Sequence, residues 1–239
     1  DEKVKFLSEE KKEIEPVPGR VLTCMHRYRN EAYHQDKLRS KIARPVALLL
    51  FEVVCDLFVD LGPKSLGVSS EDNWKWFEQR YGVRPFDAAN ENGRSVIRDH
   101  LRAGLPLSLE ELRDNLLSHL SERLESVYRA LDFMIENIVK IKTRPDAMKF
   151  AQYWAARKDV QSSPSDEEYN KFVPLRSLAD LERWSDGLSV LEKMDSKLTV
   201  FGEFVRLEEE IEPIEAIIHD QAAELDHAIQ MEIDRMRGK

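Results

Sequence analysis

The apolar residues of this chain recur three and four positions apart over long stretches that lack turn residues. The clearest stretch follows Ser108 and Glu111, which form a capping box, and continues to about residue 142. Its apolar positions are Leu109, Leu112, Leu116, Leu120, Leu124, Val127, Leu131, Met134, Ile138 and Ile141. This spacing places the side chains on one face of a helix, so the pattern predicts a long amphipathic helix.

Turn residues predict the boundaries of two helices in the first quarter of the chain. Pro16 and the residues after it are typical of a helix start. Asn30 can act as an N-cap, so we expect this helix to break and restart there. Pro45 starts a fresh segment or kinks the next helix, which Gly62 and Pro63 end.

The remaining pattern predicts helices throughout, with one ambiguous stretch. We expect helices over residues 69–82, 94–103, 145–159 and 178–239. Pro213 is expected to divide the last of these. Residues 198–207 fit a helix or a strand equally.

These elements define the predicted fold class, which is all-α. Residues 1–160 are expected to form a helical bundle, and residues 178–239 a helical C-terminal extension. Residues 161–177 are rich in Ser, Pro and charged side chains and are interpreted as a linker.

The charge distribution singles out residues 20–44. This segment holds seven Lys and Arg against two acids, a net charge of +5, in a chain whose formal net charge is −9. The remainder therefore carries −14, the difference between −9 and +5. A local basic segment in an acidic chain favours a contact with a polyanion, or a solvated face that balances acids elsewhere in the fold.

A second charge pattern follows the basic segment. Glu52, Asp56 and Asp60 form a line at four-residue spacing on the next predicted helix, which we interpret as a solvated polar stripe. A metal site would need His or further acids alongside. The chain has no Gly-rich phosphate loop and no Cys/His zinc spacing, so no cofactor or metal is expected.

The basic segment also carries residues with catalytic potential. An Arg guanidinium supplies fixed positive charge for a phosphate, and an imidazole can move a proton near neutral pH. Arg29 and His34 together meet the needs of metal-free RNA cleavage. A break at Asn30 would let both point to one side; alternatively, two copies of the chain would complement each other across a dimer.

The sequence RNEAYHQDKLR, which begins at Arg29, resembles the signature of the HEPN (higher eukaryote and prokaryote nucleotide-binding) families. These are all-α domains in which an Arg, often followed by Asn, precedes a His by four to six residues. The resemblance implies a HEPN-like bundle and a metal-independent ribonuclease that works as a dimer. Many such proteins are toxins or antiviral defence effectors. It implies that Arg29 and His34 are catalytic and that Asn30 supports them.

The sequence departs from this pattern in one residue and in its overall charge. Asp36 stands where some of these families have a regulatory Tyr, and the chain is acidic outside the basic segment. RNA contacts are therefore expected to be local, from Arg27, Lys37, Arg39 and Lys41.

The alternative to a ribonuclease is a non-catalytic helical adaptor that dimerises through its long helices. Its basic segment would dock an acidic partner or a nucleotide, and a protein partner could bind its C-terminal helices. Cys24 and Cys55 lie among apolar residues, which favours a reducing cytoplasm. Residues 45–61 are too short and too charged to cross a membrane.

Overall fold

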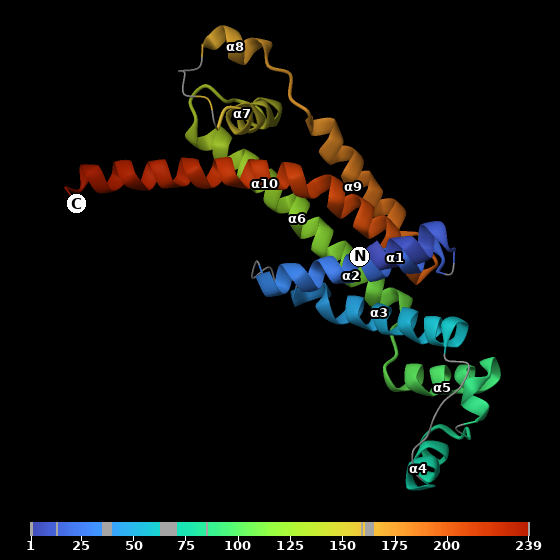
Figure 1. Cartoon of the computed structure of the whole chain (residues 1–239). Coiled ribbons are helices and arrows are strands. Elements are labelled where there is room, and N and C mark those ends of the chain that lie inside the picture. The colour runs from blue at the N-terminus through green and yellow to red at the C-terminus, as the bar shows by residue number, and fades with distance from the viewer. Residues whose placement is uncertain are drawn as a thin grey trace. The chain divides into compact units, whose positions relative to one another are not determined.

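Helices account for all the regular secondary structure in the part of the chain that the structure describes. The computed structural model describes residues 2–12, 14–34, 40–62, 71–84, 86–158, 160 and 165–238. Within these ranges there is no strand (Figure 1), which confirms the all-α prediction. The elements are α1 (Glu2–Lys5), a π-helical turn η1 (Phe6–Glu10), α2 (Pro16–His34), α3 (Ser40–Leu61), α4 (Glu71–Tyr81), a 3₁₀ turn η2 (Asp87–Ala89), α5 (Glu91–Gly104), α6 (Leu109–Asn137), α7 (Arg144–Ala156), α8 (Asp166–Lys171), α9 (Leu178–Glu192) and α10 (Lys197–Met236).

The chain divides into two compact units. Unit 1 comprises residues 1–116 and 194–202, and unit 2 comprises residues 117–193 and 203–239. The two longest helices, α6 and α10, contribute residues to both units. The predicted linker over residues 161–177 contains the short helix α8.

Unit 1 is built on the packing of α2 and α5 against α3. Its buried apolar side chains include Val21, Cys24, Ile42, Val46, Leu49 and Val53.

At the N-terminus of α5, Asn90 caps the helix by accepting the Gly93 N–H at 2.9 Å. A Cβ at position 93 would lie 2.1 Å from the Asp87 carbonyl oxygen, so only glycine fits there. This close approach holds η2 against the first turn of α5, and the helix expected over residues 94–103 begins earlier, at Glu91.

The core of unit 2 comes from α6, α9 and α10. Its fully buried residues include Leu120, Leu131, Leu181, Trp184, Phe204 and Ile211. Trp184 donates from Nε1 to Glu210 Oε2 at 2.7 Å, which satisfies its only polar group. Capping boxes begin three helices: Thr143 at α7, Ser165 at α8 and Ser177 at α9.

The predicted division of the last helix at Pro213 is wrong, because α10 runs through that residue. Helix α3 begins at Ser40 and runs through Pro45, so no fresh segment starts there. A proline inside a helix costs one hydrogen bond and about 3 kcal/mol. Both prolines are followed by a deeply buried residue, Val46 and Ile214, and burial on the continuing helix offsets that cost. The ambiguous stretch 198–207 is helical for the same reason, since its apolar residues face the core at helical spacing.

Candidate nucleic-acid interface

Helix α2 carries the residues predicted to act on RNA. It begins at Pro16, as predicted, and continues without interruption to His34. The expected break at Asn30 is therefore wrong. The Asn30 side chain does not cap a new helix; its Nδ2 amide lies 3.3 Å from Nδ1 of His26, one turn back on the same helix.

An unbroken α2 fixes the relation between positions 29 and 34. Five residues correspond to about 140° around a helix axis, so the two positions lie on different faces. The structure thus does not bring Arg29 and His34 onto one face of a single copy.

The outer face of α2 presents polar side chains near its C-terminal end. His26, Arg29 and Asn30 are exposed, whereas Val21 and Cys24 on the opposite side are buried. Positions 26, 30 and 34 follow one another at intervals of four residues, so they share a face. Both His positions of the basic segment, 26 and 34, therefore lie on this face, whereas Arg29 and His34 do not share one.

Arg27, predicted to bind RNA, lies back along its own helix. Its Nη2 is 3.7 Å from Sγ of Cys24, and its guanidinium carbon is 5.5 Å from the centroid of the Tyr28 ring. The side chain is partly buried. Packing of this kind uses the aliphatic stem and one side of the guanidinium, which makes Arg27 a less accessible phosphate ligand than Arg29.

The other residues predicted to bind RNA lie before the start of α3 and in its first turn in the sequence. Lys37 and Arg39 lie outside the described residues, and Lys41 is exposed in the first turn of α3. Arg44, also exposed, pairs with Glu111 at the start of α6, and both residues belong to unit 1. At least one cation of the basic segment is therefore matched by an acid of the same chain.

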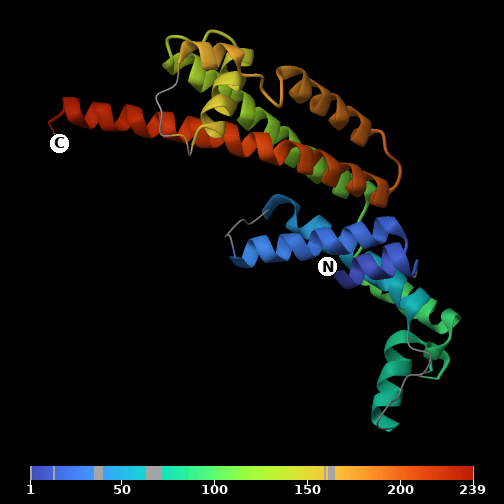
Figure 2. The same ribbon diagram turned by 45° about the horizontal axis from the view of Figure 1, so that its top comes forward.

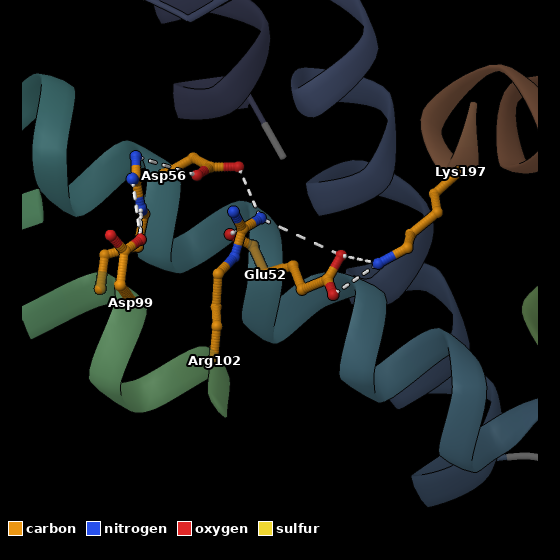
Figure 3. Close-up of polar contacts among 6 residues, drawn as sticks. Glu52, Asp56, Asp99, Arg102 and Lys197 are labelled. Atoms are coloured by element: carbon orange, nitrogen blue, oxygen red, sulfur yellow. Dashed lines mark hydrogen bonds and ion pairs between the residues drawn. The ribbon is translucent and has the colours of Figure 1, made fainter. Parts of the chain in front are cut away.

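A second polar cluster in unit 1 was missed by the sequence analysis (Figure 3). The acidic line on α3 faces an arginine line on α5 with the same four-residue spacing, Arg94, Arg98 and Arg102. Arg102 donates to Asp56 Oδ2 at 2.9 Å, and Arg98 lies 4.0 Å from Asp56 Oδ1. Arg94 donates to the Val59 carbonyl at 2.9 Å, near the end of α3.

Glu52 is the most enclosed acid of this cluster, at 12% exposure of its side chain. Lys197, at the start of α10, donates to both of its carboxylate oxygens, and Arg102 lies 4.0 Å away. Figure 3 shows Glu52 between these two cations. The prediction of a solvated stripe is wrong for Glu52. The matching spacing of Arg94, Arg98 and Arg102 was the signal in the sequence that could have revealed the pairing.

Cys55 lies next to this cluster on α3 and is buried. Burial raises the pKa of its thiol, and the nearby Arg102 guanidinium partly opposes that shift. A thiol held protonated is a weak nucleophile. Cys55 therefore serves packing, and Cys24 is likewise a buried free thiol.

The site offers proton transfer by imidazole and charge neutralisation by guanidinium. Among the described residues, no group of three or more His, Cys, Asp or Glu is arranged to hold a metal ion. Over the same ranges, no helix has the length and apolar character needed to cross a membrane.

Comparison of the chain with protein-family models, with curated proteins and with solved structures gives no significant match.

Proposed function

We propose that this chain is a metal-independent endoribonuclease of the HEPN type that acts as a pair of copies. The observation that carries the proposal is the exposure of Arg29 and Asn30 on α2, within a segment of net charge +5. An exposed guanidinium in a local basic segment suits a phosphate better than the acidic remainder of the chain does. The sequence resemblance of residues 29–34 supplies the reaction type.

The proposed chemistry needs two imidazoles and one guanidinium at the scissile phosphate. His34 of one copy removes the proton of the ribose 2′-hydroxyl, and the freed oxygen attacks the adjacent phosphorus. The 5′-oxygen leaves and takes a proton from His34 of the other copy. Arg29 neutralises the charge that develops on the phosphoryl oxygens. The products are a 2′,3′-cyclic phosphate and a 5′-hydroxyl.

Pairing of copies is part of this proposal because positions 29 and 34 diverge by about 140° on a straight helix. A second copy can bring its own position 34 to the Arg29 of the first. Asn30 then lies between the two and can orient either imidazole, as it contacts His26 within one copy. Because both cysteines are free and buried, the proposed location of the protein is a reducing compartment such as the cytoplasm.

A non-catalytic adaptor is the second candidate, and two observations favour it. The unbroken α2 separates Arg29 from His34, and Arg44 is already paired with Glu111. Under this proposal the basic segment docks an acidic protein partner or a nucleotide, and no bond is broken.

A ribonuclease assay in EDTA separates the two candidates. The full chain should cleave single-stranded RNA and leave 2′,3′-cyclic phosphate ends, and His34→Ala should abolish cleavage while leaving the circular dichroism spectrum unchanged. His227→Ala, which removes an exposed imidazole from α10, is the matched control and should cleave normally. Cleavage that survives His34→Ala, or that requires an added divalent metal, would contradict the ribonuclease proposal.

A further inference from the structure

The C-terminal part of α10 differs from the rest of that helix in its burial. In unit 2, Ile211, Ile214 and Ile218 are all 2% exposed or less. None of residues 222–238 is buried. In both views of the chain, this end of α10 extends past the ends of α6, α7 and α9 (Figures 1 and 2).

The apolar stripe of α10 nevertheless continues into this part. Leu225, Ile229, Ile233 and Met236 follow at spacings of four, four and three residues. These four positions fall within an arc of about 80° around the helix axis. The first three are partly exposed and Met236 is 73% exposed. The helix therefore carries a narrow apolar seam of the width that a single partner helix covers.

Most helices in proteins are stabilised mainly by packing of an apolar face, whereas none of residues 222–238, which continue the packed part of α10, is buried. The one side-chain ion pair that the structure gives for residues 225–238 is an exposed pair within the same helix, Arg235 with Glu232 at 2.7 Å. Such a pair contributes little to stability, so a packing partner would stabilise this end of α10.

The charges beside the seam point to that partner. Glu224 and Asp226 flank the seam at one end, where Glu224 also lies 3.8 Å from Lys158, and Arg235 and Arg237 flank it at the other, where Arg235 also pairs with Glu232. Glu224 and Arg235 are separated by about 20° around the axis, as are Asp226 and Arg237, so each flank has an acid at one end and an arginine at the other. A second copy running antiparallel places its arginines beside these acids on both flanks, whereas a parallel copy places like charges together.

We propose that two copies of this chain associate through an antiparallel pairing of the C-terminal parts of their α10 helices. The contact is isologous: Leu225 of one copy lies opposite Met236 of the other, and Ile229 and Ile233 fill the middle of the seam. Four apolar positions per copy make a short interface, so we expect reversible association with a Kd on the order of micromolar. The inference does not rest on the proposed ribonuclease activity.

The first test measures the oligomeric state of the full chain by sedimentation velocity from about 0.1 to about 100 µM, a range that brackets the expected Kd. The wild type should dimerise. Ile229→Glu with Ile233→Glu should raise the Kd at least about tenfold, because two carboxylates per copy would be buried unpaired. Met231→Glu is the matched control, since Met231 is 60% exposed and lies about 160° around the helix from Ile229. A wild type that stays monomeric, or a dimer that the double variant leaves intact, would overturn the proposal.

The second test fixes the orientation by disulfide cross-linking. Leu225→Cys and Met236→Cys are prepared separately, oxidised alone and oxidised as an equimolar mixture. Antiparallel pairing predicts a cross-linked dimer mainly in the mixture, because residue 225 meets residue 236. Cross-linking of each variant with itself, at the same rate as in the mixture, would establish a different pairing and refute this one. The native Cys24 and Cys55 are buried and are common to all samples.

Discussion

The Lys197 ammonium donates to both carboxylate oxygens of Glu52, at 2.7 and 2.9 Å, although 145 residues separate them in the sequence. The contact attaches the start of α10 to the middle of α3 within unit 1. Arg102 approaches the same carboxylate from α5. Three helices that are distant in the sequence thus meet at one largely buried charge.

The first prediction follows from this convergence. Replacing Lys197 with Met leaves Glu52 with Arg102 as its remaining described cation, at 4.0 Å. Removing one partner of a largely buried pair leaves an undercompensated charge, so we expect a loss of about 1–3 kcal/mol in the free energy of unfolding. Urea denaturation followed by circular dichroism measures it.

Lys75→Met is the control for this prediction. Lys75 pairs with Glu71 on the surface of α4, where both side chains are more than 70% exposed. Its loss should change the free energy of unfolding by less than about 0.5 kcal/mol. Equal effects of the two substitutions would mean that the contact of Lys197 with Glu52 stabilises the fold no more than an exposed ion pair does.

The second prediction compares two glycines inside helices. A Cβ at Gly187 of α9 would lie 2.8 Å from Cδ2 of Leu207, which is fully buried and has little room to move, whereas a Cβ at Gly202 of α10 meets nothing within 4 Å. Alanine favours a helix over glycine by up to about 1 kcal/mol. Gly202→Ala should therefore raise the melting temperature. Gly187→Ala should lower it, because the gain in helix propensity is exceeded by about 1–3 kcal/mol of overpacking. A higher melting temperature for both variants would show that Leu207 yields to the added methyl group.

Local patterns in the sequence predicted many of the helices and some of their boundaries. The capping signal at Ser108, the start at Pro16 and the end before Gly62 each depend on residues within one turn, and the structure has helix boundaries at all three. The end of α6 was placed five residues too late, at about 142, because Thr143 forms the cap of α7 and the chain must turn before it. The helices continue through Pro45 and Pro213 because residues beyond each proline are buried, and that burial depends on tertiary packing.

The candidate site was less predictable than the fold. The break at Asn30 was inferred from a residue type that can cap a helix, but its side chain contacts His26 instead. The arginine spacing on α5 hinted at a partner for Glu52, but the contacts with Arg102 and Lys197 could not be assigned without knowing which helices are neighbours. The resemblance of residues 29–34 to HEPN proteins stays a prediction.

The third prediction concerns stability in acid. The Ser177 backbone N–H, donating at 2.7 Å, holds the pKa of Asp180 below its ordinary value of 3.8. A depressed pKa means that this carboxylate stabilises the fold above the ordinary value and that the stabilisation is lost as the pH falls through the lower value. Asp180→Asn should therefore lower stability at neutral pH by about 0.5–2 kcal/mol, as loss of a helix cap does. Below pH 3.8 the melting temperatures of the variant and the wild type should converge.

Asp114→Asn controls for the change in net charge, since Asp114 is exposed on α6. Its melting temperature should follow that of the wild type at every pH. If the Asp180→Asn variant runs parallel to the wild type through the acid range instead of converging with it, the capping carboxylate is not the titrating group.

The last prediction separates RNA binding from cleavage. Phosphate contacts are independent of sequence and sensitive to salt, and residues 20–44 are the segment with the charge to make them. Replacing Lys37, Arg39 and Lys41 together with Gln should weaken binding to any single-stranded RNA and lower the salt slope by about 0.7 per lost contact. The control replaces Lys140, Lys142 and Lys193 with Gln, which removes the same charge from exposed positions elsewhere. Fluorescence anisotropy at several salt concentrations measures both. Equal weakening by the two triple variants would indicate a response to net charge alone. Unchanged RNA binding in the first triple variant would favour the adaptor, because the basic segment would then pair with acidic side chains, as Arg44 pairs with Glu111.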